Sequence, residues 1–332
     1  MGAFADIVGN EQIKGFLERA LQTGAVSHSY ILNGEDGTGK MMFARAFAKA
    51  LQCTGAAAGE RPCNRCHSCI QAASGNQPDI VFVQHEKAGT IGVDDIRNGL
   101  VNDIQIRPYE SQYKIYIVDE AEKLSVQAQN AMLKTIEEPP SYGIILLLSS
   151  NVNAFLPTIR SRCVELTVRP VSDAQEETYL RSHGVAEEQM TSILHFTKGN
   201  IGKAMKMAAS DQFMEMIASL RQVLRQIHGM QTEQLIQTVA LLGTYQSDIK
   251  DCLDFIELWY RDVLLFKATK DVNLLVFQEE AFELKRAAER CSYEGIELIL
   301  EAIQTARRRL DANVNFELTM QLLLETMKEA ER

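Results

Sequence analysis

The feature that most constrains this sequence is a glycine-rich loop that ends in a lysine. Residues 34–40 read GEDGTGK and match the phosphate-binding pattern G-x-x-x-x-G-K. In such a loop, backbone N–H groups turn toward phosphate oxygens, and the positive end of the next helix adds to the attraction. A strand-like run at 29–32 precedes the loop and a helical stretch at 43–51 follows it, which favours a P-loop over an ordinary glycine turn. The residues expected to contact nucleotide are Gly34, Gly37, Thr38, Gly39 and Lys40.

The residue after the lysine departs from the pattern. A serine or threonine hydroxyl normally binds Mg²⁺ there, but this chain has Met41. A thioether is a poor ligand for a hard cation that prefers oxygen. The sequence therefore predicts a degenerate nucleotide site, at which ATP or ADP binds weakly and hydrolysis is impaired.

A pair of acidic residues supports the same interpretation. Asp119 and Glu120 directly follow the apolar run 115–118. In a P-loop protein the first acid orients magnesium and the second polarises the attacking water. Such a pair on its own is most often a solvated strand end, but together with the glycine loop it indicates a nucleotide site.

The first half of the chain has an α/β pattern. Short apolar runs at 29–32, 79–83, 114–118 and 143–148 are typical of parallel strands buried on both faces. Helical stretches around 93–101 and 125–138 separate them, which predicts βαβ units. We expect a P-loop α/β domain over 1–165 that carries a cysteine module at 53–69.

After Pro170 the pattern becomes helical. Short helices are expected over 173–208, interrupted near 199–202, and longer amphipathic helices follow. Apolar faces recur over 249–267, 294–309 and 316–328. We expect a small helical lid domain over 166–208 and an all-α C-terminal domain over 209–332.

Composition sets limits on the class of protein. The chain has 332 residues and a net charge of −10, which argues against a protein that wraps nucleic acid by itself. No apolar stretch is long enough to span a membrane, and the N-terminus does not resemble a signal peptide. We therefore expect a cytoplasmic protein without a membrane partner.

Four of the seven cysteines are clustered. Cys53, Cys63, Cys66 and Cys69 supply the four thiolates of a tetrahedral, structural Zn²⁺ site. His67 is a possible substitute ligand, and unpaired thiols or an iron–sulfur site are the alternatives. A closed site of four cysteines has no open position for water, so catalytic zinc is not expected.

Several longer runs resemble the AAA+ clamp-loader subunits of bacterial DNA polymerase III. They include an acidic run, a run that ends in Glu-Glu-Pro-Pro, and a Ser-Arg-Cys tripeptide, at 119–124, 130–140 and 156–163. The opening 4–12 and residues 313–315 fit the same family. The resemblance therefore covers nearly the whole chain.

The resemblance implies a fold, partners and a role for one arginine. It implies an AAA+ domain with a zinc module, a helical lid and a C-terminal collar that joins a ring of subunits. The implied partners are the motor (gamma/tau) and delta subunits, with the sliding clamp and primed DNA reached through the assembly. Arg162 would be an arginine finger offered in trans to ATP held by a neighbour. For a lone arginine, a surface salt bridge is the alternative.

The family's active members also carry a lid arginine in a Gly-x-x-Arg context. Here residues 199–202 supply Gly202 at that position, with only Lys203 adjacent. Together with Met41, this implies a non-motor subunit without ATPase activity of its own. The alternatives are an active motor subunit of the same family, a branch-migration or replication-restart AAA+ motor acting on DNA, and a purely structural zinc protein.

Overall fold

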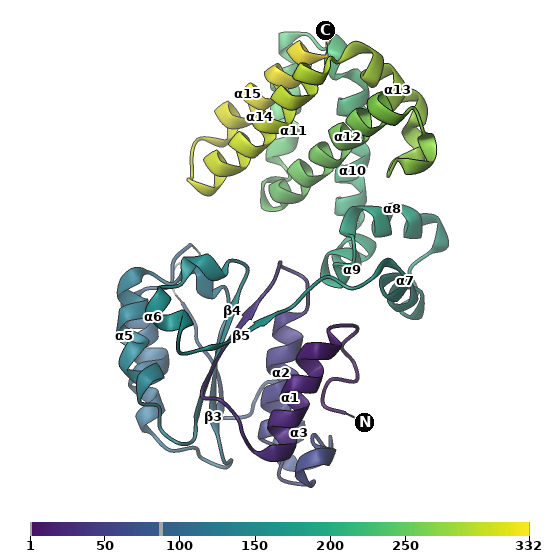
Figure 1. Ribbon diagram of the computed structural model, residues 1–332. Coiled ribbons are helices and arrows are strands. Elements are labelled where there is room, and N and C mark those ends of the chain that lie inside the picture. Colours follow the sequence, from purple (N-terminus) through teal and green to yellow (C-terminus); the bar gives the residue numbers. More distant parts are fainter. Residues whose placement is uncertain (1, 86–88, 332) are drawn as a thin grey trace. The chain divides into compact units, whose positions relative to one another are not determined.

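The computed structural model describes residues 2–85 and 89–331 and divides into two compact units. The first comprises residues 1–183 and 198–203, and the second comprises 184–197 and 204–332 (Figure 1). The three domains expected from the sequence, with bounds at 165 and 208, stay a prediction. Among the described residues, no helix is both long enough and apolar enough to cross a lipid bilayer.

The first unit is built on a five-stranded parallel sheet with strand order β2-β3-β4-β1-β5. Its strands are β1 (Ser29–Asn33), β2 (Ile80–Phe82), β3 (Lys114–Val118), β4 (Gly143–Ser149) and β5 (Val164–Thr167). The four apolar runs in the sequence predicted β1 to β4. The edge strand β5 was not predicted, because its residues VELT alternate in exposure and lack a continuous apolar run.

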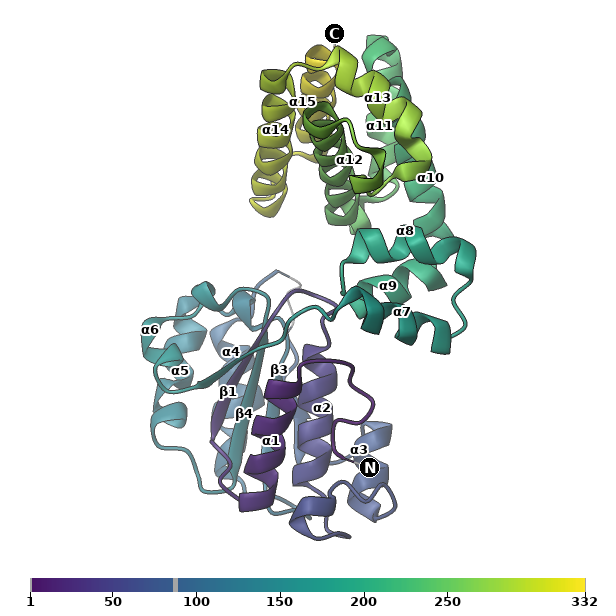
Figure 2. The ribbon, with the colours of Figure 1, turned by 45° about the vertical axis from the view of Figure 1, so that its right-hand side comes forward.

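Helices cover both faces of this sheet (Figures 1 and 2). In chain order they are α1 (Glu11–Thr23), α2 (Lys40–Leu51), α3 (His67–Ser74), α4 (Val93–Ile96), α5 (Val126–Glu137) and α6 (Pro157–Arg160). Another helix of the first unit, α7 (Asp173–Ser182), follows β5. Shorter helical turns include η2 (Arg97–Val101), η3 (Asp103–Gln105) and η4 (Ala121–Lys123). Both the α/β class and the helical stretches at 43–51 and 125–138 are confirmed.

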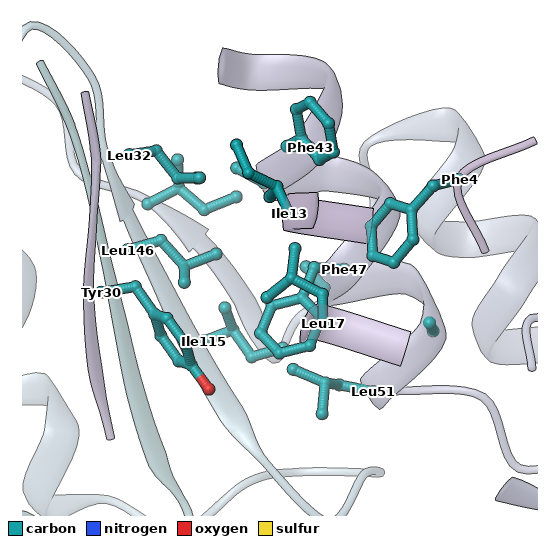
Figure 3. Packing of buried hydrophobic residues seen from close by; sticks show 14 of the residues in the cluster. Phe4, Ile13, Leu17, Tyr30, Leu32, Phe43, Phe47, Leu51, Ile115 and Leu146 are labelled. Atoms are coloured by element: carbon teal, nitrogen blue, oxygen red, sulfur yellow. The ribbon is translucent and has the colours of Figure 1, made fainter. Parts of the chain in front are cut away.

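Alternating side chains of the central strands fill two separate cores. On the α1 and α2 side, Tyr30 and Leu32 of β1 pack with Phe43 and Phe47 of α2 (Figure 3). On the opposite side, Ile31 packs with residues of β3, β4 and α5. Because successive strand residues point to opposite faces, a strand buried on both sides must be apolar throughout. This requirement explains the continuous apolar runs.

The rest of the chain is helical, as predicted. The helices are α8 (Glu187–Thr197), α9 (Ile201–Ala209), α10 (Asp211–Gln226), α11 (Thr232–Gly243), α12 (Ile249–Thr269), α13 (Ala281–Arg290), α14 (Tyr293–Asp311) and α15 (Phe316–Ala330). The second unit has its own core, in which Trp259 and Phe255 of α12 lie close to Phe277. Cys252 and Cys291 are buried in this unit, whereas Cys163 in the first unit is only partly buried.

Candidate nucleotide and metal sites

The glycine loop connects the end of β1 to the start of α2. Gly37 and Gly39 have φ values of 86° and 97°, a left-handed conformation in which a side chain would be strained. Thr38 closes the turn, because its hydroxyl donates to the carbonyl oxygen of Glu35 at 2.7 Å. Lys40 is the first residue of α2. The predicted P-loop is therefore formed in the expected strand–loop–helix context.

The Lys40 side chain is turned back into its own loop. Its ammonium donates to the carbonyl oxygens of Gly34 at 2.5 Å and Glu35 at 3.0 Å, and lies 3.2 Å from an Asp36 carboxylate oxygen. Lys40 is only 8% exposed. An ammonium has three hydrogen-bond donors. In Lys40 these donors are directed at oxygens of its own loop, and not outward to where a phosphate would bind.

The segment before and at the start of α9 lies directly on the P-loop. The amide of the Asn200 side chain donates to the carbonyl oxygen of Asp36 at 2.7 Å. The backbone N–H of Gly202 donates to the carbonyl oxygen of Gly37 at 3.0 Å. A Cβ atom at Gly202 would lie 2.5 Å from that oxygen, which is closer than such atoms approach in proteins. The position of the family's lid arginine is thus packed too tightly for a side chain in this conformation.

Met41 is partly buried and packs against the apolar core beneath α2. Its side chain contributes to packing where a hydroxyl would bind magnesium. This packing agrees with the prediction of a degenerate site.

Asp119 and Glu120 follow β3 as predicted, and both are exposed. An Asp119 carboxylate oxygen accepts the backbone N–H of Glu120 at 3.0 Å. Glu120 has a left-handed backbone with φ of 48°, and its carboxylate lies 2.7 Å from the ammonium of Lys123. Glu120 is therefore engaged in a local ion pair in this structure.

Arg162 lies just beyond α6 and forms a surface ion pair. Its guanidinium is 3.0 Å from a carboxylate oxygen of Glu137, at the end of α5, and it donates to the carbonyl oxygen of Thr158 at 3.0 Å. The Arg162 side chain is 40% exposed. Glu137 belongs to the Glu-Glu-Pro-Pro run, so two motifs far apart in the sequence meet here.

The four clustered cysteines converge on one point. The sulfurs of Cys53, Cys63, Cys66 and Cys69 all lie within 4.8 Å of one another, an arrangement that could hold a metal ion. Cys66 precedes α3, Cys69 lies in its first turn, and Cys53 follows α2. Four thiolates so close together are a typical donor set for tetrahedral zinc.

Burial raises the pKa of the Cys69 thiol to about 12. Burial also raises the pKa of Cys66, but the backbone amides of Cys69 and Thr54 outweigh it and lower the pKa to about 5. His67 is 75% exposed and faces Glu110 at 3.6 Å, so it lies outside the four-sulfur cluster. The donor set therefore consists of sulfur alone.

Asn200 is the site residue that the sequence interpretation missed. Within the run 199–202 the sequence pattern indicates no role for it, yet its side chain contacts the P-loop from 164 residues away. An asparagine between a glycine and a helix start is a weak signal, because such residues also cap helices without other contacts.

Two family models match the chain. The model described as DNA polymerase III, delta subunit, matches residues 9–172, and the model for the C-terminal part of that subunit matches residues 215–328. The chain belongs to the clamp-loader subunit family of DNA polymerase III. Its parallel sheet and helical C-terminal region match an AAA+ clamp-loader fold.

Similarity to individual family members differs in extent. The chain is 27% identical over 321 residues to DNA polymerase III subunit delta-prime of Bacillus subtilis, covering 96% of each chain. It is 40% identical over 160 residues to subunit tau of the same organism, which is 48% of this chain but only 28% of tau. It also covers 26% of the tau/gamma subunit of Haemophilus influenzae, at 34% identity. The chain thus spans about a quarter of the length of these two longer relatives.

Among solved structures, the chain is similar to a gamma-subunit-related protein of DNA polymerase III from Thermotoga maritima. The TM-score is 0.50 and the identity is 20%, over 95% of this chain and 99% of that chain. This likeness concerns the fold.

Proposed function

We propose that this chain is the delta-prime subunit of a bacterial clamp loader, a non-motor member of the ring. The observation that carries the proposal is the contact between Gly202 and Gly37. In this conformation the contact leaves no room for an arginine side chain at position 202. Met41 stands where a serine or threonine hydroxyl would bind magnesium. Similarity along the whole chain to a delta-prime subunit supports the same assignment.

In this proposal the partners are the gamma/tau motor subunits and the delta subunit. The assembly would open the sliding clamp and place it on primed DNA. Arg162 would reach ATP bound by a neighbour, where a guanidinium stabilises the charge of the transferring phosphoryl group. To do so it would exchange its ion pair with Glu137 for the phosphate, at small cost because both groups are exposed.

The four-cysteine cluster would hold one structural Zn²⁺. Its ligands would be Cys53, Cys63, Cys66 and Cys69. The ion would cross-link the segments of the chain that carry these cysteines. With no position left for water, such an ion supplies cross-linking and no catalysis.

Reconstitution with purified subunits tests the proposal. ATP hydrolysis is measured for the chain alone and after addition of gamma/tau, delta, clamp and primed DNA. We expect background activity alone, and a drop in the complex when Arg162→Ala replaces the wild-type chain. Arg160→Ala is the matched control, because Arg160 is the last residue of α6, two positions before Arg162, and pairs instead with Glu165 at 3.2 Å. Robust hydrolysis by the isolated chain would rule out a non-motor subunit.

The motor alternative makes a different prediction in the same assay. If this chain supplied its own hydrolysis, Lys40→Ala would abolish clamp loading and Arg162→Ala would have no effect.

A further inference from the structure

A surface loop next to the cysteine cluster is held by a buried carboxylate. This loop, residues 107–112, precedes β3 and is called the Tyr109 loop below. The Asp79 carboxylate accepts the backbone N–H groups of Tyr109 at 2.6 Å, Glu110 at 2.9 Å and Ser111 at 3.0 Å. Asp79 has no exposed surface. Since an unpaired buried carboxylate is costly, these three bonds fix the shape of the loop.

The side chain of Gln77 connects this arrangement to the cysteine cluster. Its amide nitrogen donates to the hydroxyl of Ser111 at 2.8 Å and to the hydroxyl of Ser68 at 3.3 Å. Its amide oxygen accepts the backbone N–H of Asp79 at 2.5 Å. Ser68 lies between Cys66 and Cys69, so the position of its backbone depends on both sulfur ligands.

A second connection starts from the other side of the cluster. Gln52 directly precedes Cys53 and is 1% exposed. Its side-chain amide donates to the carbonyl oxygen of Tyr113 at 2.7 Å and to that of Asp79 at 3.2 Å. The cluster is thus joined to the anchor of the loop through Gln52, and to both the anchor and the loop through Gln77.

The loop has little packing of its own. Tyr109 is 72% exposed and Ile106, just before the loop, is 51% exposed. The contact between His67 and Glu110 spans 3.6 Å between exposed groups and contributes little. The order of the loop therefore depends on its buried polar anchors.

We propose that metal binding at the four cysteines fixes the Tyr109 loop through Gln52, Gln77 and Asp79. This inference rests on the zinc site proposed above. A bound ion would hold Cys53, Cys66 and Cys69 at one point, and so would set the positions of Gln52 and Ser68. Loss of the ion frees these segments, and the hydrogen bonds that shape the loop weaken together.

Hydrogen–deuterium exchange on the full chain tests this coupling. Amide exchange of peptides covering residues 109–111 is compared before and after zinc is removed with a chelator. We expect exchange to become at least about ten-fold faster after removal, because each bond to the carboxylate protects an amide. Peptides from the P-loop, residues 34–40, serve as an internal reference that should change little. Unchanged protection of the loop in zinc-free, otherwise folded protein would overturn the proposal.

A substitution at Gln77 tests the hydrogen bonds between the cluster and the loop without removing the metal. Gln77→Ala should retain one zinc per chain but give faster exchange at 109–111, whereas Asn76→Ala, an exposed amide next to it, should resemble wild type. Chelation could unfold the whole unit, which would be seen as faster exchange in β4. In that case the comparison of Gln77→Ala with wild type decides: exchange at 109–111 that stays as slow as in wild type in zinc-loaded Gln77→Ala overturns the proposal. Wild-type protein without bound zinc would instead refute the metal site, and with it this inference.

Discussion

The backbone N–H of Gly202 donates to the carbonyl oxygen of Gly37, with 3.0 Å between nitrogen and oxygen. Together with the bond from the Asn200 side chain to Asp36, this bond holds the start of α9 on the turn of the P-loop. The contact is possible because neither residue has a side chain: a Cβ at Gly37 would lie 2.4 Å from the Asn200 side-chain oxygen, and one at Gly202 would lie 2.6 Å from the Gly37 Cα.

Gly202→Ala should therefore destabilise the first unit by about 1–3 kcal/mol, the usual cost of forcing extra atoms into a packed contact. Urea unfolding followed by circular dichroism measures the change. Gly15→Ala is the control, because Gly15 also lies in a helix and a Cβ there meets nothing within 4 Å. That control should be neutral or slightly stabilising. Equal effects of the two substitutions would contradict the packing argument.

Restoring the missing hydroxyl should not restore an ATPase. Met41→Thr adds a magnesium ligand but leaves Lys40 engaged by its own loop and Gly202 against Gly37. We expect ATP hydrolysis by the isolated variant to stay within a few-fold of background. A turnover of about 1 s⁻¹ or more, common for enzymes, would show that the methionine alone silences the site.

Elemental analysis should find one zinc per chain, and Cys66→Ser should remove it. Structural zinc contributes on the order of 10 kcal/mol in small modules, but the loss should be smaller here because the first unit has two apolar cores. Cys163→Ser, which lies outside the cluster, should keep the full zinc content. Wild-type protein that is metal-free and equally stable would count against the site.

Arg162→Ala should leave the chain folded, with a stability change of about 1 kcal/mol or less, because its ion pair with Glu137 is exposed. In the assembled loader the same change should lower ATP hydrolysis at one neighbouring site. Arginine fingers in other systems give roughly 10³–10⁵ in rate. The overall loss is smaller when other sites continue to turn over, so single-turnover kinetics is the sharper measurement.

Glu122 provides a pH-dependent test of the region after β3. Burial raises the pKa of this carboxyl group, but hydrogen bonds from Ser150 at 2.7 and 3.1 Å outweigh it and hold the pKa below its ordinary value. A lowered pKa means that the carboxylate stabilises the fold above the unfolded-state pKa, and that this contribution is lost as pH falls through the folded-state pKa. The stability difference between wild type and Glu122→Gln, about 1 kcal/mol at pH 7 for a half-buried group, should therefore shrink as the pH is lowered through the folded-state pKa of Glu122. A difference that stays constant throughout the acid titration would mean that packing, and not charge, is responsible.

Much of the first unit could be predicted from local sequence. The four cysteines are recognisable because x2 spacings on a short chain segment bring sulfurs together whatever surrounds them. The P-loop is recognisable from the spacing of its glycines and lysine. Strands β1 to β4 are recognisable as continuous apolar runs, which are typical of strands covered on both faces. In β5, half-buried residues alternate with exposed ones, and so its sequence contains no continuous apolar run.

Contacts between distant residues were decided by the tertiary structure alone. Met41 and Gly202 could be recognised from the sequence as departures from an ATPase. That Gly202 contacts Gly37, 165 positions away, could not be predicted. Likewise, Arg162 was identified by its motif, whereas its pairing with Glu137 depends on where α5 ends relative to α6. The anchoring of the Tyr109 loop by Asp79 is of the same kind. Side-chain spacing along a helix or strand follows from local geometry. Which polar groups meet when these elements pack depends on the whole core. No short sequence pattern specifies those meetings.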